Sequence, residues 1–428
     1  MEIGRDWLKT IFTGGLAGKK PIIPIDFELL QLEAAKKLNK KAFNYILTGA
    51  GTNQGVLNNR EAFKKYGIAP PMLQGCDKPK LEIQIFGNTF PLPFYFSPIG
   101  VLELAHPEAD LELARAAINT GITMVYSNQA SKSMEACSKL LVNSNHWFQL
   151  YFSKSRELVE SFVSRAENSA CSAIVLTLDT TTLGWRTLDL ENAYLPFIYG
   201  KGIAQYTSDP VFTKLMNTGN YQDTPNSTQH KPGMFATIEI LKSYPGSIIN
   251  NIKTRNPAKA IRCFLDIYSN PHLNWNDIIW LRKITKLPLI LKGILREDDA
   301  RKALDHGIDG IVVSNHGGRQ IDHVVSSLDA LWQIKKTLPP EYPVFLDSGI
   351  RSGTDVFIAL ALGANAVGLG RPYVYALALK GHLGVETLVQ NIATELMITM
   401  SLCGCKSIDD IKPDLICKNK FISQTHLE

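Results

Sequence analysis

The sequence predicts an α/β fold, a TIM (β/α)8 barrel with an N-terminal helical cap and a long lid loop after the fourth strand. Eight short runs of β-branched and apolar residues recur along the chain, each followed by a turn and an amphipathic stretch. The runs are apolar throughout, which is typical of parallel strands covered by helices on both faces. A chain of 428 residues is long enough for such a barrel. A doubly wound open sheet is the alternative that the same pattern allows.

The predicted strands and helices alternate from about residue 93 onward. The predicted strands are residues 94–98, 123–127, 147–152, 173–179, 289–292, 310–315, 344–347 and 366–370. The amphipathic stretches that predict outer helices are residues 107–117, 156–166, 275–284, 296–305, 354–362 and 385–400.

We expect residues 1–428 to form a single domain with a cap at 1–92, a barrel at 93–415 and a tail at 416–428 that frays beyond Lys420. A helical stretch at 27–47 predicts that the cap covers the barrel mouth. From about residue 187 to 273 no strand of the series appears, and loops of this length in compact domains are usually functional lids or disordered. We therefore expect an ordered lid at 187–273 with a mobile middle at 217–231.

The composition excludes several classes of function. The net charge of +5 arises from 45 basic and 40 acidic residues without clustered runs, so we expect no nucleic-acid partner. The seven cysteines form no zinc-type spacing, which predicts no metal site and reduced thiols in a cytoplasmic protein. No segment approaches the roughly 20 apolar residues of a membrane span, and the N-terminus lacks the apolar run of a signal peptide.

Polar side chains stand at the ends of most predicted strands. Functional groups of TIM barrels cluster at the carboxyl ends of the strands, so position alone makes these residues candidates. The strand-end candidates are Ser97, Pro98, Ser127, Gln149, Tyr151, Thr177, Asp179, Lys292, His316, Asp347, Gly370 and Arg371.

His316 is the strongest candidate for a catalytic base. Gly317 and Gly318 follow it, which lets the backbone turn and leaves the imidazole free to face a ligand. A neutral imidazole can accept a proton at physiological pH, and a neighbouring carboxylate orients it. We expect Asp179 to be that carboxylate.

Two further patterns predict anion binding. Arg319 and Arg186 each offer a planar fork suited to a substrate carboxylate. The small-residue turns 347–353 and 368–372 follow the last two strands, where TIM barrels bind phosphate. Lys292 leaves a different class open, because a strand-end lysine can be the Schiff-base nucleophile of a lyase.

The chain resembles the FMN-dependent 2-hydroxy acid oxidases and dehydrogenases over about residues 27–415. The resemblance rests on five stretches: 314–320, 346–353, 370–372, 148–151 and 176–180. It is strongest to the lactate 2-monooxygenases, on residues 98–101, 183–186, 209–212 and 347–351 and on Gly100, where several relatives carry alanine.

The resemblance implies FMN as the cofactor and a role for each matching residue. His316 would be the base, held by Asp179, with Tyr151 and Lys292 also catalytic. The substrate carboxylate would meet Tyr45, Arg186, Arg319 and Tyr151. The FMN would be held by Ser97, Pro98, Ile99, Gly100, Ser127, Gln149, Thr177, Lys292, Ser314, Asp347, Gly349, Arg351, Gly370 and Arg371.

The implied reaction oxidises a small L-2-hydroxy acid, with lactate as the default, and O2 takes up the electrons. In-site decarboxylation of the product, as in lactate 2-monooxygenase, and a dehydrogenase that uses a quinone or a cytochrome are both left open. A homo-oligomer, tetramer or octamer, is also implied. Gln129 and Thr181-Thr182 depart from the family pattern, so the resemblance leaves the substrate's side chain open.

Overall fold

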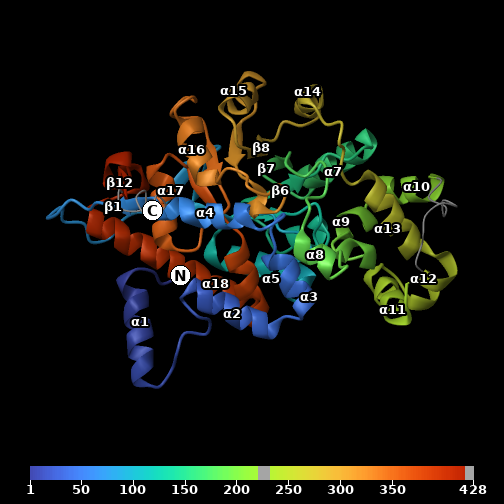
Figure 1. The fold of residues 1–428 in the computed structure, drawn as a ribbon, viewed down its shortest axis with the longest axis horizontal. Coiled ribbons are helices and arrows are strands. Elements are labelled where there is room, and N and C mark those ends of the chain that lie inside the picture. Colours follow the sequence, from blue (N-terminus) through green and yellow to red (C-terminus); the bar gives the residue numbers. More distant parts are fainter. Residues whose placement is uncertain (220–231, 420–428) are drawn as a thin grey trace, which may run out of the picture.

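The computed structural model describes residues 1–219 and 232–419 and is built around a closed barrel of eight parallel strands (Figure 1). The predicted barrel is therefore confirmed, and the open sheet is wrong. Each predicted strand is present, with ends that shift by one or two residues. In barrel order the strands are β10 (Val344–Leu346), β11 (Ala366–Leu369), β4 (Phe94–Phe96), β5 (Met124–Tyr126), β6 (His146–Leu150), β7 (Ala173–Thr177), β8 (Leu289–Ile294) and β9 (Gly310–Val313).

An outer ring of helices covers the barrel. Five of them overlap the predicted amphipathic stretches closely, α18 begins 14 residues before the stretch predicted at 385–400, and α6 and α16 were not predicted. Several of these helices begin at a serine whose hydroxyl accepts a backbone N–H of the first turn, as Ser155 does for α7 and Ser352 for α17. The ring consists of α5 (Asp110–Thr120), α6 (Met134–Ser138), α7 (Arg156–Asn168), α14 (Trp275–Ile284), α15 (Glu297–Asp305), α16 (Ser327–Lys335), α17 (Gly353–Ala361) and α18 (Arg371–Cys403).

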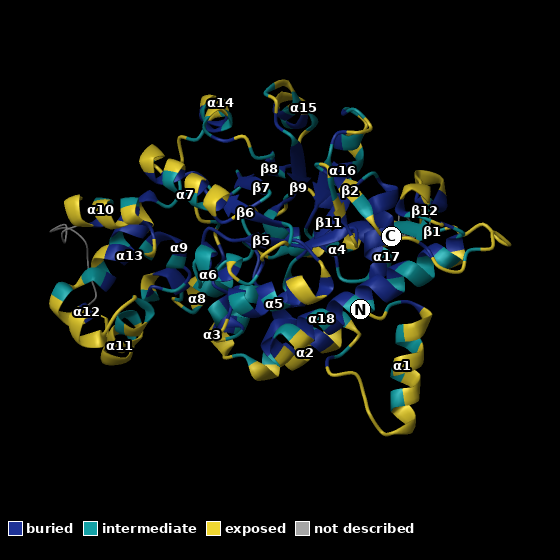
Figure 2. Cartoon of the chain, turned by 180° about the vertical axis from the view of Figure 1, so that it is seen from behind, coloured by how far each residue is buried: buried dark blue, intermediate teal, exposed yellow. Residues whose placement is uncertain are grey.

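The core lies in the strands and on the inner faces of these helices. Figure 2 shows α18 and the barrel strands mostly buried, whereas α1 and the lid helices α11 and α12 expose much of their surface. The helix α18 bends where Gly381 takes a φ of +57°, so it runs as two straight pieces along α17 and α5. Within the described residues, no helix has the length and apolarity that a bilayer span requires.

The N-terminal segment differs from the single helix expected at residues 27–47. The chain breaks at Leu38 and Asn39, because the Asn39 side chain accepts the N–H of Ala42 and begins a new helix. Tyr45 therefore comes from a separate short helix that lies against the cavity. The N-terminal helices are α1 (Arg5–Leu16), α2 (Phe27–Lys37), α3 (Lys40–Leu47) and α4 (Gln54–Lys64).

Part of the predicted cap closes the opposite end of the barrel. The hairpin of β2 (Ile83–Ile85) and β3 (Asn88–Phe90) packs under the barrel, where Phe86 and Phe90 meet Trp147 with ring centroids 6.3 and 6.2 Å apart. At the mouth, α3 lines the cavity through Tyr45 and Ile46 and α4 packs on the turn at His316–Gly318, whereas α1 and α2 pack against α18 and the hairpin lies at the other end. At the start of the predicted tail, β12 (Ile416–Lys418) pairs with β1 (Tyr66–Ile68). Residues 420–428, expected to fray, lie outside the described residues.

The long segment between β7 and β8 is helical and docks onto the barrel. Gly202 donates its N–H to Glu103 over 3.0 Å, and the Gln205 carboxamide accepts the N–H of Met134 over 3.0 Å. The middle of the predicted lid falls largely on residues 220–231, outside the described residues. The lid contains α8 (Thr187–Glu191), a 3₁₀ turn (Pro196–Tyr199), α9 (Ala204–Thr207), α10 (Pro210–Thr218), α11 (Met234–Ser243), α12 (Ile248–Thr254) and α13 (Asn256–Ile267).

The aromatic rings packed around Trp147 under the barrel, here called the aromatic plug, predict that removal of Trp147 strongly destabilises the fold. Trp147 is 2% exposed and its ring lies 5.6 Å from that of Tyr95 and 5.5 Å from that of Phe345, centroid to centroid. We expect Trp147→Ala to lower the free energy of unfolding by about 3–5 kcal/mol through the cavity it leaves. Chemical denaturation measures this. Trp185→Ala is the control, since Trp185 is 71% exposed; equal losses in the two variants would contradict the plug.

Candidate functional site

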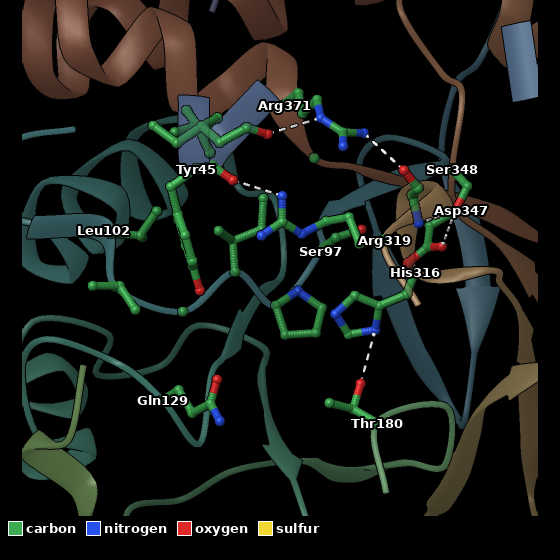
Figure 3. A pocket seen from close by; sticks show the side chains of 18 of the residues that line it. Tyr45, Ser97, Leu102, Gln129, Thr180, His316, Arg319, Asp347, Ser348 and Arg371 are labelled. Atoms are coloured by element: carbon green, nitrogen blue, oxygen red, sulfur yellow. Dashed lines mark hydrogen bonds between the residues drawn. The ribbon is translucent and has the colours of Figure 1, made fainter. Parts of the chain in front are cut away.

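A cavity opens at the carboxyl ends of the barrel strands (Figure 3). The structure brings most predicted site residues to its wall. Those that line it are Tyr45, Ser97, Pro98, Ile99, Gly100, Tyr151, Arg186, Lys292, His316, Arg319, Asp347, Gly349, Arg351, Gly370 and Arg371. Those that do not are Ser127, Gln149, Thr177, Asp179 and Ser314. All are buried except Asp179, which is partly exposed, and all except Thr177 are bonded to lining residues or their neighbours.

His316 stands at the start of a short 3₁₀ turn (His316–Gly318) after β9, with a φ of +57°. Its Nδ1 lies 2.7 Å from Asp179 Oδ1, and Thr180 Oγ1 lies 3.3 Å from the same nitrogen. Because Nδ1 is engaged by Asp179, Nε2 is the nitrogen left for a ligand. Burial lowers the pKa of His316 below 6.5, and the nearby Lys292 cation adds to this, although Asp179 opposes it. The imidazole is therefore neutral at physiological pH and fit to accept a proton.

Lys292 lies at the centre of a buried charge cluster behind the cavity wall. Its Nζ donates to Ser314 Oγ over 2.8 Å and lies 3.4 Å from Asp347 Oδ2 and 3.6 Å from Asp179 Oδ2. Burial alone would lower the pKa of Lys292, but the two carboxylates raise it above its ordinary value. The amine is thus held as an ammonium. A Schiff-base nucleophile must be neutral, so this geometry argues against the lyase alternative.

Two guanidinium groups form a carboxylate-sized site next to His316. Only Nη1 of Arg319 is bonded within the described residues, to the carbonyls of Tyr45 and Thr48 over 2.6 and 2.8 Å, which leaves Nε and Nη2 for a ligand. Burial and the neighbouring Arg186 lower the pKa of Arg319 to about 9. Arg186 is 5% exposed, and in the part of the chain that the structure describes its side chain bonds only to Arg319 O and Gln320 Oε1. This accumulation of buried positive charge calls for an anion.

A second cationic site lies at the turns after β10 and β11. Burial and the neighbouring Arg371 lower the pKa of Arg351 to about 9, and Arg351 Nε is buried without a hydrogen-bond partner in the described residues. Arg371 begins α18 and donates to the backbone carbonyls of Ile46, Gly317 and Thr48. Gly349 has a φ of +100°, and a Cβ there would lie 2.6 Å from the Asn59 carbonyl oxygen. Such a turn beside a helix N-terminus fits a phosphate.

Between the two cationic sites, several buried polar atoms have no partner among the described residues. These are Gln149 Nε2, Thr177 Oγ1 and Ser97 Oγ. Gln149 is held from behind, because its Oε1 accepts from the Asn128 N–H and from Ser127 Oγ over 3.0 and 3.3 Å. The Ser97 hydroxyl lines the cavity, whereas Gln149 and Thr177 do not. Buried polar groups are rarely left unpaired, so a ligand whose polar edge reaches these atoms and whose anionic end meets the arginines fits the cavity. FMN has both features.

The structure also adds residues that the sequence did not single out. Thr180 donates to Asp179 Oδ1 over 2.9 Å, and Ser348 donates to Asp347 Oδ1 over 3.0 Å while accepting the Gly317 N–H. Thr180 and Ser348 directly follow the predicted carboxylates Asp179 and Asp347 in the sequence, and this adjacency could have identified them as site residues. Other added lining residues have no local signal, since the lid and the loop after β4 bring them in: Leu102, Leu104, Leu183, Phe197 and Tyr268.

Comparisons with known proteins agree with this geometry. Residues 34–418 match the model of a family described as FMN-dependent dehydrogenase. The chain is 37% identical over 396 residues to an L-lactate oxidase of Lysinibacillus sphaericus, covering 92% of this chain and 93% of that protein. It is 34% identical over 387 residues to 2-hydroxyacid oxidase 1 of Homo sapiens, covering 90% and 94%.

Solved structures give the same result. The crystal structure of a mandelate oxidase superposes with a TM-score of 0.73 at 30% identity and covers 92% of this chain and 98% of that one. A putative lactate oxidase of Pediococcus acidilactici superposes with a TM-score of 0.76 at 30% identity, covering 94% and 97%.

The geometry of the second cationic site leads to the prediction that FMN binds more weakly when Arg351 loses its charge. We expect Arg351→Met to weaken FMN binding by about 2 kcal/mol, roughly 30-fold, because a buried charge that meets the phosphate is removed. Titration of the apoprotein, followed by quenching of flavin fluorescence, measures this. Riboflavin, which lacks the phosphate, should bind the variant and the parent alike. Arg301→Met, on the exposed face of α15, is the control; an unchanged FMN affinity in Arg351→Met would contradict the assignment.

Proposed function

The chain belongs to the family of FMN-dependent dehydrogenases, and from this premise we propose that it oxidises a small L-2-hydroxy acid to the 2-oxo acid, with O2 as the electron acceptor. The observation that carries the proposal is the pair of His316 Nε2 and the Arg319 guanidinium on one cavity wall. When bound, FMN accepts two electrons from the hydroxy acid and delivers them to O2.

The substrate is bound through its carboxylate. Arg319 and Arg186 meet that group with guanidinium donors, and Tyr45 and Tyr151 add hydroxyl donors from the same wall. This fixes the C2 hydroxyl toward His316 Nε2, which takes its proton. Asp179 then stabilises the imidazolium, a role that suits a carboxylate whose pKa is lowered by His316 and Lys292 against the effect of burial.

The remaining assigned residues hold the cofactor. With FMN bound, Lys292 would supply a fixed positive charge beside the ring, which favours negative charge there. Ser127, Gln149 and Thr177 would hold the polar edge of the ring, and residues 97–100 with Ser314 would complete the ring site. Asp347, Gly349, Arg351, Gly370 and Arg371 would hold the ribityl phosphate.

The docked lid supports a second step. Phe197 and Tyr268 reach the cavity from the lid, and Arg165 on α7 holds the lid by donating to Asp209 Oδ2 over 2.8 Å. If the 2-oxo acid stays under this lid, peroxide attacks it and yields the acid shortened by one carbon, CO2 and water. This is the reaction of lactate 2-monooxygenase. A lid that opens faster gives the oxidase reaction, 2-oxo acid and peroxide.

We further propose a cytoplasmic homo-oligomer, a tetramer or octamer. No disulfide joins any of the seven cysteines, all of which lie in the described residues, and this suits a reducing compartment. The exposed Phe12 and Leu16 on α1 and Leu29 and Leu32 on α2 form an apolar surface suited to a second copy.

The pH dependence of flavin reduction tests His316. Burial holds its folded-state pKa below 6.5, and only the neutral form can act as the base. We therefore expect the anaerobic reduction rate to stay constant at neutral pH and to fall only as the pH drops below 6.5. His316→Ala should lower the rate by about 10²–10⁴-fold while FMN remains bound. His272→Ala, at an exposed position, is the control; rapid bleaching of the flavin in His316→Ala would remove the base role.

Product analysis tests the electron acceptor and the second step. With lactate and O2 we expect turnover to give acetate and CO2 when the lid retains the product, and pyruvate and peroxide when it does not. Stopped-flow mixing of the reduced enzyme with O2 checks the acceptor. Very slow reoxidation by O2, combined with fast reoxidation by a quinone or cytochrome, would replace both reactions with the dehydrogenase alternative.

A further inference from the structure

The side chain of Gln129 is a buried polar group of the cavity that the reaction does not use. Gln129 lines the cavity and is 8% exposed, yet its carboxamide makes no hydrogen bond with any residue in 1–219 or 232–419. Figure 3 shows Gln129 on the opposite side of the cavity from Arg371 and Asp347. The carboxamide atoms open onto the cavity and are not enclosed by protein atoms. A ligand that covers them without bonding them would leave a buried amide unpaired, which costs free energy, so a ligand group that bonds the amide is favoured.

The backbone of Gln129 is fixed on several sides. Its carbonyl accepts the Val101 N–H over 2.9 Å, and its own N–H donates to Ser127 Oγ over 3.1 Å. Val101 has a φ of +58°, a strained conformation for a β-branched residue that this contact helps to hold. A Cβ on Gly100 would lie 2.9 Å from Gln129 Cβ. The carboxamide therefore projects from a rigid base, which favours selective binding.

The surroundings of Gln129 separate it from the carboxylate site. Apolar side chains from the loop after β4 and from the segment between β7 and β8 line the same cavity: Leu102, Leu104, Leu183 and Phe197. Phe197 lies close to the Gln129 backbone, because a Cβ on Gly202 would approach both the Gln129 carbonyl oxygen and the Phe197 ring, at 3.0 and 3.3 Å. The free guanidinium donors belong to Arg319 and Arg186, which already suffice for one carboxylate. Gln129 is neutral and offers one acceptor and two donors, so it matches a hydroxyl or an amide and provides no charge for a second carboxylate.

We propose that Gln129 selects 2-hydroxy acids whose side chain ends in a hydroxyl or a carboxamide over acids of the same shape that end in a methyl group. This rests on the proposed function, in which the cavity binds a 2-hydroxy acid by its carboxylate. The hydroxyl or carboxamide at the end of the substrate's side chain hydrogen-bonds the Gln129 carboxamide, while the apolar residues contact the substrate's methylene carbons.

Two isosteric substrates test the proposal on the FMN-loaded enzyme. L-2,4-dihydroxybutanoate and L-2-hydroxypentanoate differ only by a terminal hydroxyl in place of a methyl group. We expect kcat/KM for flavin reduction to favour the dihydroxy acid by about tenfold or more. In Gln129→Leu the ratio should fall to about one or below. Gln84→Leu, in the β2–β3 hairpin, should keep the ratio of the parent enzyme.

A binding measurement gives an independent readout. The dissociation constants of 4-hydroxy-2-oxobutanoate and 2-oxopentanoate are obtained from changes in the absorbance of the oxidised flavin, without turnover. The parent enzyme should favour the hydroxylated acid, and Gln129→Leu should not. Gln129→Met, which also removes the amide at similar volume, repeats the test if Gln129→Leu does not retain FMN.

The outcomes separate this inference from the proposed function. Equal losses for both substrates in Gln129→Leu would mean that Gln129 binds the part they share, and would overturn the selectivity. A parent enzyme that favours 2-hydroxypentanoate would overturn it as well. Flavin that no 2-hydroxy acid bleaches would refute the proposed function, and the binding of the two 2-oxo acids would still decide the role of Gln129.

Discussion

The arrangement of the site depends on the Lys292 ammonium, which is buried between Asp179 and Asp347. An isolated charge at such depth would be neutralised, but two carboxylates and Ser314 Oγ keep it ionised. The same contact keeps Asp179 ionised, and Asp179 orients the His316 imidazole. Since these side chains come from the ends of four neighbouring strands, the parallel register of the barrel sets the distances between them. A lysine without both carboxylates would lose its charge, and the base would lose its orientation.

The polarity of the cavity follows from what surrounds this cluster. Burial and mutual repulsion lower the pKa of Arg319, Arg351 and Arg371, so this wall carries more positive charge than its own residues neutralise. Such a wall is stable because backbone carbonyls accept the guanidinium donors, as those of Thr48 and Ile46 do. Carbonyl dipoles reduce the cost without removing the charge. The free energy of burying these guanidinium groups is expended when the protein folds, so an anionic ligand meets charges that are already desolvated. This explains why one cavity suits both a phosphate and a carboxylate.

The sequence predicted the parts of this arrangement that depend on local periodicity and on strand ends. Eight apolar runs gave the barrel, and the strand-end rule placed His316 and Lys292 at one rim. Contacts between distant segments could not be predicted in this way. The break at Leu38 depends on one capping side chain, Asn39, inside an otherwise helical pattern. The hairpin with Phe86 closes the lower end only because the barrel presents Trp147 there. Lining residues such as Tyr268 depend on the path of a long lid, for which no periodic signal exists.

The division of the barrel into an aromatic lower end and a polar upper end explains how strained backbone can persist at the site. His316, Ser348 and Val101 all have positive φ values, which cost of order 1–3 kcal/mol each at non-glycine positions. Such conformations survive only where the surrounding structure over-determines them. The rings packed under the barrel anchor strands whose other ends carry these residues, so the stable end lies away from the reacting groups. The cavity must accommodate a charged cofactor and a substrate beside the His316 base. The packing that stabilises the fold therefore lies at the opposite end of the barrel.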